Sequence, residues 1–290
     1  IPVFVDITPG TFNLDPAQVE ESISPKTKAI LCVHQMGMPC DLVEILRIAN
    51  KHGIKVIEDA ACAIGSQVKM GTQWQEIGRP HGDIACFSFH PRKVITTGDG
   101  GMLTTNNAKY AEKFRLWRQH SMSIPDTIRH ESSSVIFEEY TELGFNYRMT
   151  DLQAAIGRIQ LKRLNEIVTG RRERAGYYYK RLKEVPNISL PEEPEWAKSN
   201  WQTFCVRIPK ELDQKKVMQS MLEKGISTRR GIMCAHREPV FQNEEWRCNT
   251  ELGNSEFAQD HSLAIPLYYP MEEEDQDRVI EALITSVTQE

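Results

Sequence analysis

The first 105 residues alternate short apolar segments with helical segments, and this alternation constrains the fold more than any other feature. Apolar runs of strand length lie at residues 3–6, 28–34, 54–58, 84–89 and 101–105. Helices are predicted at 15–24 and 41–52, the second with Asp41 as N-cap and Gly53 just after its end. The run at 28–34 is almost continuously apolar, as in strands that are covered on both faces. This order predicts an α/β fold with a mostly parallel sheet flanked by helices.

The rest of the chain shows a pattern typical of an α+β unit. An amphipathic helix is predicted at 106–122 and a polar surface loop at 123–143. Thr150-Asp151-Leu152-Gln153 is a capping box, and the helix that it begins carries an apolar face of Leu152, Ile156, Ile159 and Leu164. Beyond it we expect a helix at 166–184, a strand at 203–208, a helix at 212–225, a weakly periodic loop at 226–256 and a helix at 273–289. We therefore predict a large domain at 1–165 and a smaller C-terminal domain at 166–290.

Composition argues against several classes of function. The net charge of −5 gives no support for binding to nucleic acid or acidic membranes. No apolar run approaches the ~20 residues that a membrane span requires, and no signal-peptide pattern is present. The seven cysteines are an odd number without a CxxC pair, which favours free thiols in a reducing compartment over disulfides or a metal site. We expect a cytoplasmic protein without a bound metal.

Two residues with the chemistry of a cofactor site lie at the ends of apolar strands. Asp59 follows Val56-Ile57-Glu58, and Lys93 lies just beyond the strand that ends near Phe89. In parallel α/β sheets, ligands bind beyond the carboxyl ends of the strands. A pyridoxal phosphate enzyme needs a lysine that forms the Schiff base and a carboxylate that keeps the pyridinium nitrogen protonated. The pair predicts this cofactor, although alone Asp59 also fits a turn or capping residue and Lys93 a surface lysine.

Further residues suit a flat, phosphorylated cofactor. Ala61 shares a face with Asp59 if the chain stays extended, and its small side chain lets a ring lie against the backbone. Ser88 offers a hydroxyl to a phosphate, and glycines at 98, 100 and 101 allow close backbone approach. A turn serine and a hairpin-like glycine turn are the alternatives. No dinucleotide fingerprint follows any strand, so a nicotinamide oxidoreductase is disfavoured.

With these motifs the chain resembles the DegT-type nucleotide-sugar aminotransferases, which belong to the fold-type I pyridoxal phosphate enzymes. The resemblance spans almost the whole sequence and rests on the order of many short strings. These are Pro2-Val3-Phe4-Val5-Asp6, Val33-His34 followed by Gly37, Glu58-Asp59-Ala60-Ala61, Phe87-Ser88-Phe89 with Lys93, Thr97-Gly98-Asp99-Gly100-Gly101-Met102, Asn146-Tyr147-Arg148-Met149, Asp151-Leu152-Gln153-Ala154-Ala155 and Ile265-Pro266-Leu267-Tyr268.

The resemblance implies a role for each cofactor residue. Lys93 forms the Schiff base and later moves the proton between cofactor and substrate carbons, while Asp59 pairs with the pyridinium nitrogen and Ser88 holds the phosphate. Asn146 is expected to reach the cofactor phosphate of the other subunit, which implies a homodimer with shared sites. Cys62 departs from the family, which usually has a glutamine there that contacts the cofactor ring hydroxyl. A thiol forms only weak hydrogen bonds.

The cation-dense segment 228–239 is the candidate substrate region. In members of the family it approaches the nucleotide-sugar pocket, and clustered arginines suit a pyrophosphate. Arg229, Arg230 and His236 are therefore candidates for substrate binding, with a solvated loop as the alternative. His34, at a strand end, is a further candidate, and its alternative is a structural histidine.

The activity implied is transfer of an amino group from glutamate to a keto group of a nucleotide-linked sugar, as in polysaccharide biosynthesis. One alternative is a pyridoxal phosphate-dependent sugar dehydratase of the same fold, in which histidine replaces the lysine at position 93. Another is a non-catalytic regulatory or binding relative. Members of the family also carry an N-terminal segment ahead of the position of Ile1, with a phosphate-binding turn and a stacking aromatic residue. We expect that this sequence lacks it and that this chain alone binds the cofactor weakly.

Overall fold

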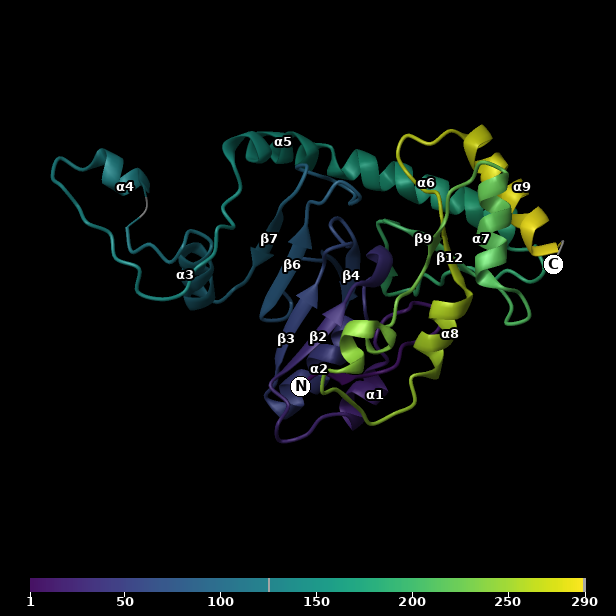
Figure 1. Cartoon of the computed structure of the whole chain (residues 1–290), viewed down its shortest axis with the longest axis horizontal. Helices are drawn as coiled ribbons and strands as arrows, with labels where there is room; N and C mark the ends of the chain where they lie inside the picture. Colours follow the sequence, from purple (N-terminus) through teal and green to yellow (C-terminus); the bar gives the residue numbers. More distant parts are fainter. Residues whose placement is uncertain (125, 289–290) are drawn as a thin grey trace.

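A four-stranded sheet forms the centre of the first half of the chain (Figure 1). In the computed structural model, which describes residues 1–124 and 126–288, its strand order is β2–β3–β6–β7. The first three strands are parallel and the fourth is antiparallel, which confirms the predicted mostly parallel sheet. The bounds are Ala29–Val33 for β2, Lys55–Asp59 for β3, Ile84–Ser88 for β6 and Gly101–Thr104 for β7.

The helices beside this sheet begin and end where local signals place them. Asp15 caps α1 (Pro16–Glu21), and the Asp41 carboxylate caps α2 (Leu42–His52) by accepting from the backbone N–H of Glu44 at 3.2 Å. Gly53 follows α2 in the left-handed conformation, with φ of 66°. The apolar face of α2 is buried in the same core as the alternate residues of β2 and β3.

Several short elements were not predicted. A hairpin of β4 (Gln67–Met70) and β5 (Gln73–Glu76) follows β3, and β4 also pairs with β8 (Ala197–Lys198). Its residues are mostly polar and few, so they lack the alternation that predicts a strand. The predicted strand at 3–6 is the shorter β1 (Val3–Phe4), which pairs with β11 (Arg247–Cys248) rather than with the central sheet. The 3₁₀ turn η1 (Gln35–Gly37) follows β2.

The second half of the chain, from α6 onward, is built on an antiparallel sheet in the order β10–β12–β9. Residues of the helices α6, α7 and α9 pack into its core. Tyr178, Phe204, Leu263 and Leu283 are fully buried there. The segment 226–256, predicted as a loop, contains the short strands β10 and β11, the turns η2 and η3 and the start of helix α8. The bounds are β9 Phe204–Arg207, β10 Arg229–Arg230, β12 Ser262–Ile265, α6 Leu164–Leu182, α7 Gln214–Glu223, α9 Glu273–Thr288, α8 Gly253–His261, η2 Ala235–Arg237 and η3 Pro239–Gln242.

The predicted domain boundary at 165–166 falls in the first turn of α6 and stays a prediction. Two predicted positions lie outside the described residues. These are residue 125 of the predicted loop and residue 289 at the end of the last predicted helix. No helix in the described part of the chain is long and apolar enough to cross a membrane.

A long segment between the two halves projects away from the body of the molecule, at the left of Figure 1. It holds α3 (Ala108–Trp117) at its base and the short helix α4 (Asp126–Glu131) near its tip. The chain then returns to α5 (Asp151–Lys162), which begins at the predicted capping box: Thr150 and Gln153 exchange both hydrogen bonds. Of the predicted apolar face, Leu152, Ile156 and Ile159 lie on α5 and are exposed to solvent. Leu164 instead begins α6 and packs against a buried cluster, because α5 ends at Lys162.

Candidate active site

The carboxyl ends of β3 and β6 lie side by side, because Asp59 is the register partner of Cys86. The loops that follow these strands carry Cys62 and Lys93. The Lys93 ammonium Nζ donates to the Cys62 sulfur across 3.1 Å. The structure therefore brings two of the predicted cofactor residues, separated by about thirty positions, into direct contact at the expected edge of the sheet.

Asp59 is half-buried and has one carboxylate oxygen left for a ligand. Its Oδ1 accepts from the backbone N–H of Ala61 at 3.0 Å, which closes the turn after β3. No described residue donates a hydrogen bond to Oδ2. Burial raises the pKa of the neighbouring Cys86 thiol, and the Asp59 carboxylate raises it further. An oxygen in this position suits a protonated ring nitrogen.

Ser88 ends β6 and lies beside the glycine-rich turn. Its hydroxyl accepts from the backbone N–H of His90 at 3.3 Å, so its own proton remains available to a ligand. Gly100 adopts φ of 144°, and a Cβ there would approach the side chains of Thr97 and Met149 within 3 Å. Asp59, Ser88 and Lys93 are all half-buried. Together they offer an acceptor, a hydroxyl donor and an amine, and this set fits pyridoxal phosphate.

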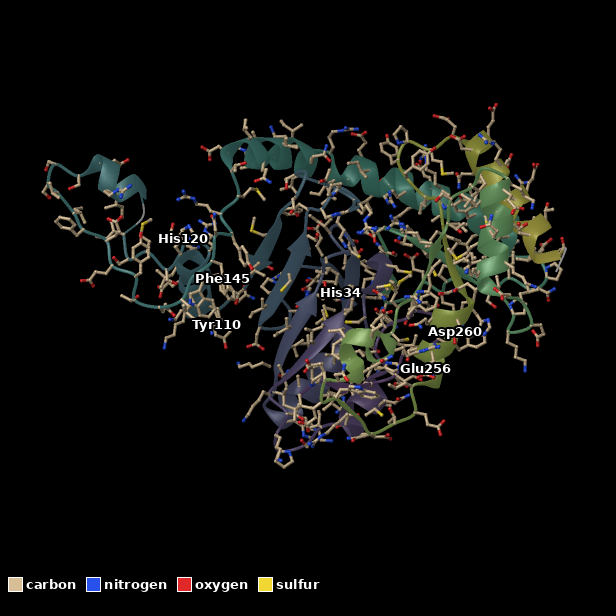
Figure 2. All side chains as sticks on the ribbon, viewed as in Figure 1. His34, Tyr110, His120, Phe145, Glu256 and Asp260 are labelled. Carbon is tan, nitrogen blue, oxygen red and sulfur yellow. The ribbon has the colours of Figure 1, made fainter. Side chains whose placement is uncertain are left out.

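Asn146 lies on the projecting segment and not at this edge of the sheet. It is exposed and pairs with Gln119 in an isolated bridge. Figure 2 shows its neighbour Phe145, with His120, on the segment at the left, whereas His34 lies at the centre of the molecule. No hydrogen bond joins Asn146 to Asp59, Ser88 or Lys93 among the described residues, and its contact with the cofactor phosphate of another subunit stays a prediction.

His34 is fully buried, and its ring has a partner on each nitrogen. Nδ1 accepts from the backbone N–H of Cys40 at 3.1 Å, so the ring proton is assigned to Nε2, which donates to Glu58 Oε2 at 3.3 Å. Because His34 is fully buried, a substrate could reach its ring only if the surrounding residues moved apart. The geometry favours the structural alternative, which sequence alone could not separate from a pocket residue.

Sequence reasoning missed Glu58, a fully buried carboxylate next to Asp59 on β3. Its Oε1 accepts from the backbone N–H groups of His81 at 2.9 Å and Gly82 at 2.7 Å, and Oε2 faces His34. Burial lowers the pKa of His81, and the Glu58 charge opposes that effect. Glu58 ties the ends of β2 and β3 to the loop before β6. The sequence feature that could have identified Glu58 is an ionisable residue inside an apolar strand.

In the cation-dense segment 228–239, two of the three candidate substrate residues pair with nearby carboxylates. Arg230 pairs with Glu238 at 3.1 Å, and His236 Nε2 lies 2.9 Å from a carboxylate oxygen of Glu256, on α8. Arg229 is exposed on β10 and forms no ion pair with a described residue. No hydrogen bond joins any of the three to Lys93 within the part of the chain that is described. Their roles toward a substrate stay predictions.

The model of the DegT/DnrJ/EryC1/StrS aminotransferase family matches residues 1–284. The chain belongs to this family. The resemblance inferred from the sequence is thus confirmed, and with it the pyridoxal phosphate-dependent aminotransferase fold and the enzyme class.

Individual relatives agree with this assignment. The chain is 36% identical to the GDP-perosamine synthase of Caulobacter vibrioides, covering 97% of this chain and 72% of that protein. It is 34% identical, with the same coverage, to the spore coat polysaccharide biosynthesis protein SpsC of Bacillus subtilis. The crystal structure of the aminotransferase TlmJ from Streptoalloteichus hindustanus superposes with a TM-score of 0.87 at 30% identity, over 99% of this chain and 73% of that one.

Proposed function

We propose that this aminotransferase moves an amino group from glutamate to a keto group of a nucleotide-linked sugar. The observation that carries the proposal is that Asp59 lies at the carboxyl end of β3 with Oδ2 unbonded to any described donor, while the Lys93 amino group contacts Cys62 in the neighbouring loops. The relatedness to a GDP-perosamine synthase and to SpsC supports a nucleotide sugar as acceptor and polysaccharide biosynthesis as the setting. A lysine at 93, where the dehydratases have histidine, argues against the alternative reaction.

The residues of the site divide the work. Asp59 would hold the pyridinium nitrogen through its free Oδ2, and Ser88 would hold the phosphate through its hydroxyl proton. When bound, pyridoxal phosphate supplies an electron sink for the carbon that gains or loses the amino group. Lys93 would take the proton from that carbon and return it through its amino group, which lies 3.1 Å from the Cys62 sulfur in the loops that follow β3 and β6.

An absorbance spectrum with added pyridoxal phosphate, before and after glutamate, tests this function. We expect a visible band from the cofactor bound to Lys93 and its replacement by a near-ultraviolet band when glutamate is added. Lys93→Ala should lose both the band and turnover, whereas Lys109→Ala, which changes an exposed lysine on α3, should keep both. Turnover in Lys93→Ala, or no band in the wild type even at a large excess of pyridoxal phosphate, would refute the proposal.

We infer that a second copy of the chain covers the exposed apolar face of α5. Leu152, Ile156 and Ile159 are 80%, 51% and 57% exposed, and Leu143 on the adjoining segment is 91% exposed. Apolar side chains gathered in this way are typical of an interface. The same segment carries Asn146, so a dimer through this region would bring Asn146 toward the partner's site. Ile156→Asp should shift the protein to monomer in sedimentation, and Leu222→Asp, at an exposed leucine of α7, should not.

Mixing two inactive variants tests whether the site is shared. If Asn146 serves the partner's site, a heterodimer of Asn146→Ala and Lys93→Ala has one site with both lesions and one intact site. Random exchange then restores about a quarter of the wild-type activity. If Asn146 serves the site of its own subunit, every site keeps at least one lesion and mixing restores nothing.

A further inference from the structure

A short segment of the second half, residues 199–203, contacts the turn that carries Cys62. Asn200 is fully buried, and its side-chain Nδ2 donates to the backbone carbonyls of Cys62 at 2.8 Å and Ile64 at 2.9 Å. Its Oδ1 accepts from the backbone N–H of Gln202 at 2.9 Å. The Nδ2 amide therefore joins this segment to the turn after β3, while Oδ1 holds the backbone of the segment itself.

The same segment also contacts the loop that carries Lys93. The Gln202 side chain donates through Nε2 to the backbone carbonyl of Arg92 at 3.1 Å, one residue before Lys93. Lys93 in turn donates to the Cys62 sulfur at 3.1 Å. Asn200 thus bonds the backbone of Cys62, and Gln202, two residues later, bonds the backbone next to Lys93. The two side chains support both partners of the Lys93–Cys62 contact.

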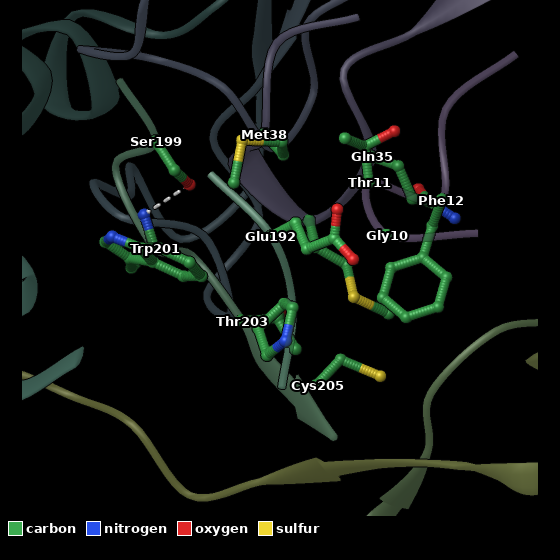
Figure 3. Close-up of a pocket in the computed structure, with 12 residues that line it drawn as sticks. Gly10, Thr11, Phe12, Gln35, Met38, Glu192, Ser199, Trp201, Thr203 and Cys205 are labelled. Carbon is green, nitrogen blue, oxygen red and sulfur yellow. Dashed lines mark hydrogen bonds between the residues drawn. The ribbon is translucent and has the colours of Figure 1, made fainter. Parts of the chain in front are cut away.

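The segment itself is firmly anchored. The Arg171 guanidinium on α6 donates to the carbonyls of Trp201 at 2.9 Å, Gln202 at 2.6 Å and Leu267 at 3.0 Å. Burial lowers the pKa of Arg171 to about 10, which leaves it charged at neutral pH. The cavity beside Trp201 in Figure 3 has a volume of only about 10 Å³. That is room for about one water molecule, so the segment has little space to shift.

We propose that Asn200 and Gln202 are positioning residues that set the place of the Lys93 amino group. They do not touch a substrate; they act through the backbone at Cys62 and Arg92. The inference rests on the proposed role of Lys93 as the cofactor-binding amine. It also assigns the second half of the chain a part in the site, because a shift of segment 199–203 would move both loops together.

Isosteric variants test the proposal. Asn200→Asp and Gln202→Glu replace the donating amide with a carboxylate that faces the same carbonyl oxygens. The matched control is Gln214→Glu, because the Gln214 Nε2 also donates to two backbone carbonyls, those of Gln259 at 2.9 Å and Ser262 at 2.7 Å. Both carbonyls lie in the second half of the chain, and neither belongs to a loop of the site.

Two readouts separate positioning from general stability. We expect all three variants to lower the melting temperature. Only Asn200→Asp and Gln202→Glu should raise the Kd for pyridoxal phosphate by about tenfold or more, which corresponds to about 1.4 kcal/mol. They should also change the rate at which iodoacetamide alkylates Cys62 in the cofactor-free protein by severalfold, as followed by peptide mass spectrometry. The increase in Kd caused by Asn200→Asp should shrink in a Cys62→Ala background, because both changes act on one contact.

Equal Kd values and equal Cys62 alkylation rates in the wild type, Gln214→Glu and the two site variants would overturn the inference. If Asn200→Asp fails to fold, Gln202→Glu still decides, since its bond to Arg92 lies at the surface. If the wild type shows no cofactor band even at a large excess of pyridoxal phosphate, the proposed function fails. The alkylation rates of Cys62 then test the positioning contacts on their own.

Discussion

Replacement of Gly37 by alanine should destabilise the protein far more than a glycine change normally does. Gly37 has φ of +93°, where L-residues are strained by about 1–2 kcal/mol. A Cβ at this position would stand 1.9 Å from Asn200 Oδ1 and 3.1 Å from the carbonyl oxygen of Cys62. Asn200 would have to move, and its carboxamide takes part in three partly buried hydrogen bonds worth about 1 kcal/mol each. If all three bonds are lost, the expected loss is about 4–5 kcal/mol in the free energy of unfolding.

Gly71→Ala is the matched control. Gly71 has φ of +62°, but nothing lies within 4 Å of its would-be Cβ, so only the backbone cost of about 1–2 kcal/mol applies. Urea unfolding followed by far-ultraviolet circular dichroism measures both losses. The double variant Gly37→Ala/Asn200→Ala should recover part of the difference, because the clash disappears with the side chain. Equal losses for Gly37→Ala and Gly71→Ala would refute the reasoning and show that Asn200 is not held rigidly.

Three further changes have defined outcomes. Lys51 and Arg47 lower the pKa of Glu20 from 4.5 to about 2. This contribution to stability is therefore present above pH 4.5 and lost as the pH falls toward 2, and Glu20→Gln should flatten the acid-unfolding curve in that window. Thr150→Ala removes the N-cap of α5 and should cost about 1 kcal/mol in urea unfolding. His34→Leu should cost about 2–4 kcal/mol, because Glu58 Oε2 loses its donor and the backbone N–H of Cys40 loses its acceptor, yet leave the KM for the sugar unchanged. A raised KM with unchanged stability would show that His34 binds the substrate and is not a structural residue.

The elements whose signals lie within a few residues were predictable. Asp41 and Gly53 delimit α2, and Thr150 with Gln153 begins α5, because capping depends on neighbours three or four positions away. The apolar runs located the central strands, and the parallel order placed Asp59 and the loop of Lys93 at one edge. Family membership also followed from sequence, since it rests on the order of short strings.

What covers the α5 face was not predictable, because periodicity shows that a face is apolar but not what lies against it. The exposure of Leu152 and Ile156 became visible only in the structure. His34 has the same ambiguity, because a buried and a pocket histidine at a strand end look alike until the partners on both ring nitrogens are known.

Sequence by itself determined the family and the parallel sheet, and it predicted Lys93 and Asp59 as the cofactor residues. Only the tertiary structure decided what supports them. The Asn200 side chain reaches the carbonyl of Cys62 across 138 positions of chain, and no local pattern distinguishes it from any other polar residue. Hydrogen bonds of this kind depend on which distant segments the packed cores bring together. Capping and periodicity depend on the residues themselves, which is why they can be read directly from the sequence.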